Sequence, residues 1–156
     1  MLKYIAAIWV LVVASTDAAS AQSAQAVLAA FGLLGTWSLN CGLAPGVDNP
    51  RLTFSAPVDG DATLKYEFGP TKAPRNFVIK RATDLSAERV LIHEYQPDDN
   101  SVVDTVLQRL DGKVRIVWSR ESDSGKVLMQ NGAAVSSGTT ENWFSPCKLS
   151  SGTAPD

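Results

Sequence analysis

The sequence has few of the residues that catalysis requires. Its 156 residues include one histidine and two cysteines. The histidine, His93, would share a strand face with Leu91 and Tyr95, which predicts a partly buried structural role rather than that of a catalytic base. No Gly-X-Ser-X-Gly motif presents a serine nucleophile, and no glycine-rich loop between a strand and a helix could cradle a phosphate. We therefore expect no catalytic residue and a protein that is not an enzyme.

Clusters of metal ligands and of basic residues are also missing. Acidic residues come in pairs such as Asp59 with Asp61 and Asp98 with Asp99, but none continues into the spacing of a calcium loop. We therefore expect neither a metal site nor a cofactor. The formal net charge is −2, and the scattered basic residues form no stripe of the kind that binds nucleic acid.

The long apolar run of the sequence lies at its N-terminus. Residues 1–21 combine one early lysine, an apolar run over residues 4–14 and small residues at Ala19 and Ala21, which is the pattern of a signal peptide. A run of about eleven residues is shorter than the roughly twenty that a transmembrane helix needs. We expect cleavage before Gln22, no stable membrane anchor, and a periplasmic or secreted protein.

The remainder of the chain predicts one domain over residues 22–149. About 135 residues are enough for one domain with a genuine core. The alanine-rich segment 23–31 predicts a short helix that Ser23 caps and Gly32 ends. The last residues, 150–156, are small and polar, and we expect them to be a flexible tail.

After Gly35 the hydrophobic pattern changes to the two-residue period of strands. Residues 62–68 alternate apolar with polar side chains, as in a strand with one wet face. The pair Asp111-Gly112 suits the tight turn of a hairpin over residues 102–120. The predicted strands, eight or nine in number, cover residues 36–41, 51–56, 62–68, 76–82, 89–95, 102–110, 113–120, 126–130 and 142–147.

The two cysteines predict how this sheet is arranged. In an oxidising compartment Cys41 and Cys147 would most often form a disulfide, although two free thiols or an incomplete metal pair are alternatives. The bond would place the first and last strands side by side and close the sheet into an antiparallel up-and-down barrel. Eight strands make the closing pair antiparallel, so the segment 126–130 is expected to be a lid or no strand at all. A β-sandwich is the alternative fold.

The sequence Gly35-Thr36-Trp37, following a short helix, resembles the Gly-X-Trp opening of the calycins and the first strand of avidin-like proteins. The resemblance implies a closed barrel that holds a small apolar ligand in a cup. In lipocalins the tryptophan plugs the closed end and packs against an arginine near the end of the barrel. The last strand here has no arginine, and Arg115 or Arg120 could instead stack on an indole ring.

Six aromatic residues lie on the apolar sides of their predicted strands. They would either line a ligand site or fill the core, because a barrel of eight strands is just wide enough for both. These residues are Trp37, Tyr66, Phe68, Phe77, Trp118 and Trp143.

Three functions are compatible with these observations. The first is an exported binding protein that holds a small apolar or amphipathic ligand beside Trp37 and Trp118. The second is an inhibitor of an exported hydrolase, a lysozyme or a metalloprotease, which would act through the residues before Gly35 or the loops at 42–50 and 131–140. The third is a structural or accessory protein of the cell envelope.

Overall fold

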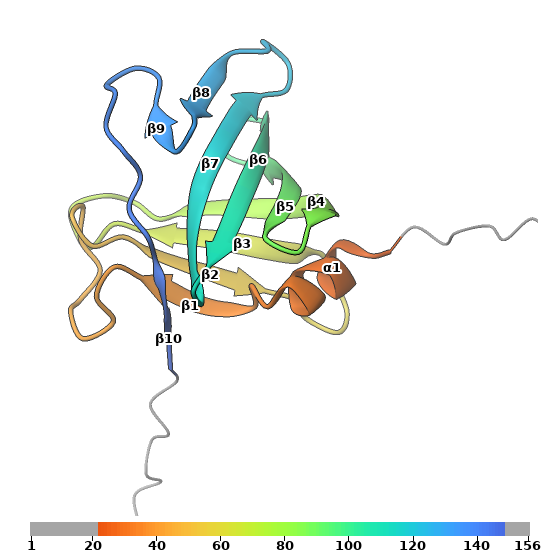
Figure 1. Cartoon of the computed structure of the whole chain (residues 1–156), viewed down its shortest axis with the longest axis horizontal. Coiled ribbons are helices and arrows are strands. Elements are labelled where there is room, and N and C mark those ends of the chain that lie inside the picture. Colours follow the sequence, from red (N-terminus) through yellow and green to blue (C-terminus); the bar gives the residue numbers. More distant parts are fainter. Residues whose placement is uncertain (1–21, 149–156) are drawn as a thin grey trace, which may run out of the picture.

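The computed structural model describes residues 22–148. Within them, ten antiparallel strands form a single sheet, and one short helix precedes it. Figure 1 shows the sheet curling around its own concave face as a half-barrel. The predicted signal peptide (1–21) and the predicted tail (150–156) lie outside the described residues.

The chain runs up and down through the sheet. Neighbouring strands pair in the order β10-β1-β2-β3-β4-β5-β6-β7-β8-β9. The elements are α1 (Ala24–Phe31), β1 (Gly35–Ser38), β2 (Arg51–Ser55), β3 (Ala62–Glu67), β4 (Arg75–Ser86), β5 (Arg89–Gln96), β6 (Ser101–Leu110), β7 (Lys113–Glu121), β8 (Val127–Gln130), β9 (Ala133–Ala134) and β10 (Ser145–Cys147). Because all described strands belong to one sheet, the alternative of a β-sandwich is excluded.

The number of strands differs from the eight or nine predicted. The segment 126–130, which we expected to be a lid or no strand, contains β8. The sequence pattern misses β9 because its two residues are too few to show an alternation. An even number of strands was expected to make the first and last strands antiparallel, and β10 does pair antiparallel with β1.

Alternating side chains of the strands build one apolar core. In β5, every second residue from Val90 to Gln96 is buried and the residues between them are more exposed, as expected for a sheet with one covered face. The core consists of Val27, Leu28, Phe31, Leu33, Trp37, Leu52, Phe54, Ala62, Leu64, Phe77, Ile79, Ala82, Val90, Ile92, Leu107, Val114 and Phe144.

Helix α1 begins and ends at the predicted residues. The hydroxyl oxygen of Ser23 accepts a hydrogen bond from the backbone N–H of Ala26 at 3.2 Å, which satisfies one free donor of the first turn. Gly32 follows the helix in the left-handed conformation, with φ of 75°, where a residue with a side chain is disfavoured. The helix packs its buried face against β4, so it belongs to the core of the half-barrel.

The arginine that covers the core beside helix α1 is Arg109, rather than Arg115 or Arg120 as the sequence suggested. Arg109 donates a hydrogen bond to the carbonyl oxygen of Phe31, and its guanidinium lies 4.9 Å from the centre of the Phe31 ring. Trp37 is only 4% exposed, and its indole Nε1 donates to the carbonyl oxygen of Leu33 at 2.7 Å. The arginine therefore stacks on the helix phenylalanine rather than on the strand tryptophan.

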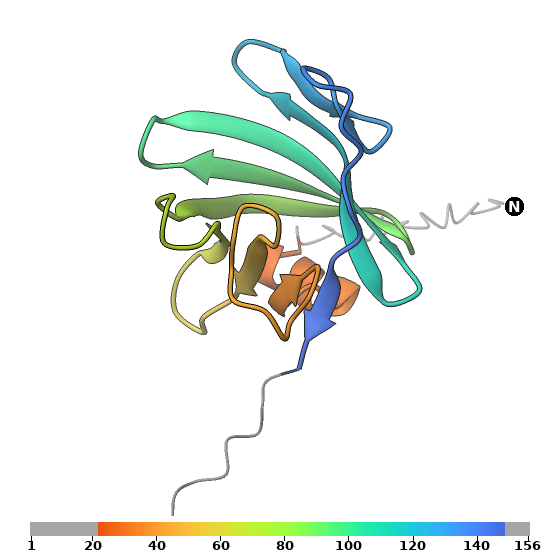
Figure 2. The ribbon, with the colours of Figure 1, turned by 90° about the vertical axis from the view of Figure 1, so that its left-hand side faces the viewer.

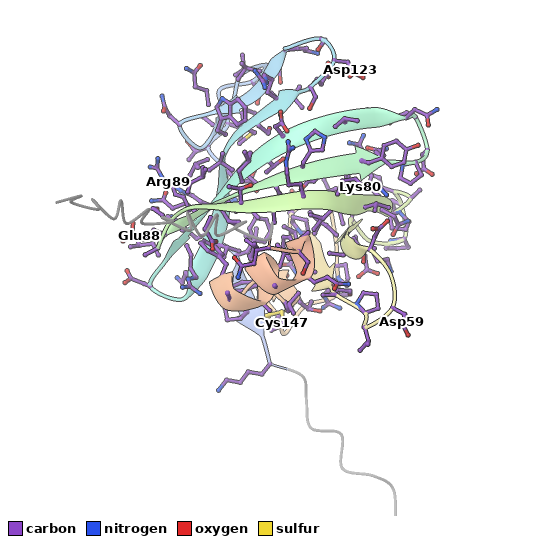
Figure 3. All side chains as sticks on the ribbon, turned by 90° about the vertical axis from the view of Figure 1, so that its right-hand side faces the viewer. Asp59, Lys80, Glu88, Arg89, Asp123 and Cys147 are labelled. Carbon is purple, nitrogen blue, oxygen red and sulfur yellow. A yellow bond between two sulfur atoms is a disulfide. The ribbon has the colours of Figure 1, made fainter. Side chains whose placement is uncertain are left out.

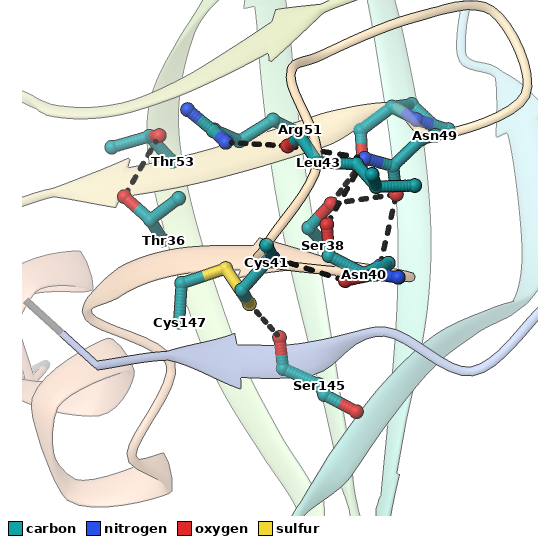
Figure 4. Close-up of a disulfide and its surroundings, with 12 residues drawn as sticks. Thr36, Ser38, Asn40, Cys41, Leu43, Asn49, Arg51, Thr53, Ser145 and Cys147 are labelled. Carbon is teal, nitrogen blue, oxygen red and sulfur yellow. Dashed lines mark hydrogen bonds between the residues drawn. A yellow bond between two sulfur atoms is a disulfide. The ribbon is translucent and has the colours of Figure 1, made fainter.

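The predicted disulfide joins the two ends of the sheet. The Cα atoms of Cys41 and Cys147 lie 5.4 Å apart, and 106 residues separate them in the sequence. Cys147 is in β10, whereas Cys41 lies in the turn after β1 rather than on the strand itself. Figure 4 shows the bond beside the paired backbones of β1 and β10.

The C-terminal segment also crosses the opening of the half-barrel. Phe144 exchanges both backbone hydrogen bonds with Val114 of β7, at 2.8 and 3.0 Å, directly before β10 pairs with β1. Figure 2 shows this segment running from the β8–β9 hairpin past β7 to the first strand. The observed fold is thus a half-barrel bridged by its last segment, and complete closure remains a prediction.

Candidate functional site

One end of the half-barrel interior is polar. On the inner face, the core residue Ile92 of β5 is in register with Thr105 of β6, which is in register with Ser119 of β7. Thr105 and Ser119 are both buried, as is Glu94, the next inward residue of β5. Buried polar side chains in an apolar core are informative because they need hydrogen-bond partners. This group therefore marks a candidate site.

Glu94 is the least satisfied member of this group. Its side chain is buried, with the residue 3% exposed, and Oε2 accepts a long hydrogen bond of 3.4 Å from the Thr105 hydroxyl. The other oxygen, Oε1, has no hydrogen-bond partner in the described part of the chain. Burial raises the pKa of Glu94 to about 8, and the Thr105 hydroxyl opposes the increase. The carboxyl group is therefore mostly protonated at neutral pH.

Two more ionisable residues face the same region. Burial raises the pKa of Tyr66 well above its ordinary value, and the negative charges of Glu94 and Glu141 raise it further, whereas Arg75 lowers it. Burial also raises the pKa of Glu141. The electrostatic influence of both glutamates on Tyr66 shows that the three side chains lie in one neighbourhood.

A pocket of about 410 Å³ opens at this end of the half-barrel, and we call it the mouth pocket. It lies between the β1–β2 loop and the segment 139–144. Its walls combine four apolar residues with two acidic ones, and no basic residue lines it. The principal lining residues are Leu39, Val47, Pro50, Phe144, Asp48 and Glu141. The volume is within the range of small-molecule sites.

The β1–β2 loop is held in place by the side chain of Asn49. Its Oδ1 accepts from the hydroxyl of Ser38 at 3.0 Å and from the backbone N–H of Asn40 at 2.9 Å. Its Nδ2 donates to the carbonyl oxygens of Asn40 and Ala44, both at 3.1 Å. Figure 4 shows this network next to the disulfide. One wall of the mouth pocket is therefore preorganised.

Four of the six aromatic residues singled out from the sequence lie in or near the core, and the rings of three of them, Tyr66, Phe68 and Phe77, are in contact. Trp37 and Phe77 are buried in the core. Tyr66, which is partly buried, meets Phe77 edge to face with ring centres 5.6 Å apart and stacks on Phe68 at 6.1 Å. Phe68 itself lies under the Lys72 ammonium and lines a smaller surface pocket.

Trp118 lies on the outer face of the sheet instead of lining the interior. A bulge in the β6–β7 pairing inserts one extra residue in β7, so that Trp118 is in register with Val106 rather than with an inward residue. Without the bulge, strict alternation would place Trp118 on the same face as Val114. The Arg120 guanidinium stacks over Trp118 at 5.5 Å, as the sequence suggested.

Trp143 also packs outside the core. It precedes the buried residue Phe144, and the Arg115 guanidinium lies 4.5 Å from the centre of its ring. The predicted stacking of this arginine on an indole is therefore present. Trp143 itself does not lie in the interior, where the alternation had placed it.

The sequence analysis missed Glu94, Thr105 and Glu141. A signal for Glu94 was present, because it occupies an apolar position of the alternation that starts at Val90 and Ile92. His93, the histidine that the sequence pattern singled out, lies on the opposite face of β5.

His93 takes part in a chain of polar contacts on that outer face. Its Nδ1 lies 2.6 Å from one carboxylate oxygen of Asp104, and Arg120 donates to the other oxygen at 3.2 Å. Burial raises the pKa of Asp104, but the hydrogen bonds from His93 and Arg120 outweigh this effect and hold the pKa below its ordinary value. These contacts fit the predicted structural role of the histidine.

No protein family model matches the chain, and neither a curated protein nor a solved structure matches it. The resemblance to the calycins therefore rests on Gly35-Thr36-Trp37 and on a curled antiparallel sheet that is compatible with a barrel. Among residues 22–148, no helix has the length and hydropathy of a membrane span, and no three His, Cys, Asp or Glu side chains are grouped as metal ligands would be.

Proposed function

We propose that this protein is a non-enzymatic binding protein that takes a small amphipathic molecule into the mouth pocket. The observation that carries this proposal is the lining of the mouth pocket, where two acidic residues, Asp48 and Glu141, lie beside apolar side chains and no basic residue of the described chain is present. A ligand with a cationic donor group and an apolar chain would complement both parts of this lining.

The charges around the site favour a basic head group. Asp48 and Glu141 line the mouth pocket, and none of the described basic residues does. An amine supplies hydrogen-bond donors and a positive charge, which complement the oxygens and the negative charge of these two side chains. Leu39 and Phe144 offer apolar surface for the rest of the molecule. A primary amine with an apolar chain is the simplest ligand with these properties.

A role outside the cytoplasm supports the same proposal. The Cys41–Cys147 disulfide is typical of proteins in an oxidising compartment. We therefore place the protein in the periplasm or among secreted proteins, where the disulfide would stabilise the binding domain.

The test is a calorimetric titration of the oxidised protein with octylamine, octanol and octanoate. These ligands share one chain length and differ in the head group. We expect octylamine to bind with micromolar affinity and octanoate at least about tenfold more weakly. Equal binding of the three, or none, would contradict the proposal.

A matched pair of variants locates the site. Glu141→Gln should weaken octylamine binding by about tenfold, since a charge-assisted hydrogen bond contributes about 1.5–3 kcal/mol. Glu88→Gln removes an exposed glutamate outside the mouth pocket and should leave the affinity unchanged. Equal effects of the two substitutions would show that the amine binds elsewhere.

A second candidate function is inhibition of an exported hydrolase by the β1–β2 loop. Leu43 and Val47 are 57% and 63% exposed on this loop, so the loop presents two apolar side chains to solvent. Asn49 holds the loop from within, and Cys41 anchors its start through the disulfide. A rigid loop that presents apolar residues suits insertion into the cleft of an enzyme.

A further inference from the structure

A second concave surface lies on the outer face of the sheet. Arg89 of β5, Gln108 of β6 and Arg115 of β7 are in register across three strands. Next to them, Val106 is in register with Trp118. These residues alternate with the buried inward residues of their strands, so they face away from the core.

These residues line a pocket of about 450 Å³, which we call the outer groove. Leu85 and Asn131 contribute to its walls from β4 and from the β8–β9 turn. Figure 3 shows Arg89 at the start of β5, on the surface of the sheet. The volume is sufficient for a small molecule, and none of the lining residues belongs to the mouth pocket.

The outer groove is positively charged, in contrast to the mouth pocket. Neither Arg89 nor Arg115 forms an ion pair with any of the described residues, and no acidic residue lines the groove. Arg120, beyond the groove, differs from them because Asp104 neutralises it. Two guanidinium groups without an ion-pair partner among the described residues therefore line one groove that has no acidic residue.

Arg115 is held in place while its charge stays available. Its Nη2 donates to Gln108 Oε1 at 3.3 Å, and its guanidinium stacks on Trp143. The Nε atom is buried and has no hydrogen-bond partner in residues 22–148. Because Arg89 and Arg115 lie two strands apart, their Cα atoms are separated by about 10 Å. Two long side chains at this separation can converge on one anion above Gln108.

We propose that the outer groove binds a small aromatic carboxylate. The guanidinium groups of Arg89 and Arg115 hold the carboxylate, because their planar donor sets match its two oxygens. Trp118 and Val106 provide the apolar surface for the ring. Arg120 fixes the Trp118 indole by stacking over it and contributes no free charge. The site is independent of the amine site in the mouth pocket.

The test is a calorimetric titration of the oxidised protein with 2-naphthoate at two salt concentrations. We expect saturable binding that weakens as salt is added, because the arginines are accessible to solvent ions. The neutral analogue 2-naphthylmethanol, which lacks the carboxylate, should bind at least about tenfold more weakly. No binding of 2-naphthoate at millimolar concentration would overturn the proposal.

Variants assign the binding to the outer groove. Arg89→Gln and Arg115→Gln should each weaken 2-naphthoate binding by about tenfold. Arg81→Gln, on the neighbouring strand and outside the groove, should leave the affinity unchanged. Arg115 also stacks on Trp143, so its loss could disturb the local structure. A melting curve of Arg115→Gln tests whether this variant is still folded, and Arg115→Lys retains the positive charge as a control. Unchanged affinity in the exposed variant Arg89→Gln would overturn the assignment by itself.

One further variant separates this proposal from the proposed function. Glu141→Gln should reduce octylamine binding and leave 2-naphthoate binding unchanged. A loss of 2-naphthoate binding in this variant would place the carboxylate in the mouth pocket and overturn the outer-groove proposal, whatever the result for octylamine.

Discussion

A carboxyl group surrounded by an apolar interior favours its neutral form, because burial penalises the charged state more than the protonated one. Glu94 is such a group, with a pKa of about 8 in the folded protein against 4.5 as the ordinary value. The Thr105 hydroxyl opposes this increase only in part. At the residue scale, the state of the candidate site is therefore set by one proton.

This proton makes stability depend on pH. Between about pH 4.5 and pH 8 the folded protein retains a proton on Glu94 that the unfolded chain has released. The free energy of unfolding should therefore fall as the pH rises through this range. Glu94→Gln should reduce the decline, whereas Glu88→Gln should preserve it. Glu141, whose pKa is also raised, accounts for a remaining decline in the same direction.

Urea unfolding of the two variants at pH 5 and pH 8 measures this effect. A decline in Glu94→Gln as steep as that of the unsubstituted protein would show that Glu94 is charged in both states, which contradicts its assigned role.

The residue scale also shows where sequence reasoning stops. Alternation correctly placed Trp37, Phe77 and Tyr66 in or against the core. It misplaced Trp118, because the bulge in β7 depends on how the strand pairs with β6. Such a shift leaves no trace in the periodicity of a single strand. Glu94 was readable from its position, but its missing partner depends on side chains from other strands.

At the scale of elements, local signals predicted most of the fold. Ser23 and Gly32 bound α1, and Asp111 and Gly112 both adopt positive φ in the β6–β7 turn, at 51° and 72°. The weak cases are the short elements β9 and β10, which pairing partners stabilise more than their own sequences do.

The β1–β2 loop carries the prediction of the second candidate function. If the loop inhibits an enzyme, stoichiometric amounts of the protein should abolish the activity of a lysozyme or of a secreted zinc protease. Leu43→Asp should then reduce inhibition by at least about tenfold, because a charge would be buried at the centre of the interface. Val58→Asp, at a fully open position with 96% exposure, is the control.

Activity assays with purified enzymes measure this inhibition. An absence of inhibition at stoichiometric excess would remove the second candidate and would leave the mouth pocket proposal intact.

At the scale of the whole molecule, the disulfide determines how the ends of the sheet are held together. It links residues separated by 106 positions, and the chain-entropy model assigns about 4 to 5 kcal/mol to a loop of this length. Cys147→Ser should therefore lower the free energy of unfolding by about 2–5 kcal/mol and lower the melting temperature clearly. Thermal unfolding followed by circular dichroism measures the change. The unsubstituted protein with its disulfide chemically reduced should show a similar decrease in melting temperature. An unchanged melting temperature would show that the backbone pairing of β1 with β10 holds the ends without the bond.

The arrangement of the whole molecule separates two surfaces of opposite charge. The acidic mouth pocket opens at one end of the half-barrel, and the basic outer groove lies on the outside of β5, β6 and β7. Neither surface could be located from the sequence, since each joins residues that are distant along the chain. The sequence predicted the curled antiparallel sheet and the covalent link between its ends, which together bring these residues into place.

The most direct test of the proposed function is a map of backbone amide chemical shifts during a titration with octylamine. Binding in the mouth pocket predicts the largest changes at Val47 and Asp48 and at residues 140–142, with no change at Arg89 or Trp118. Changes confined to the outer face of the sheet, or none at saturating octylamine, would contradict the account.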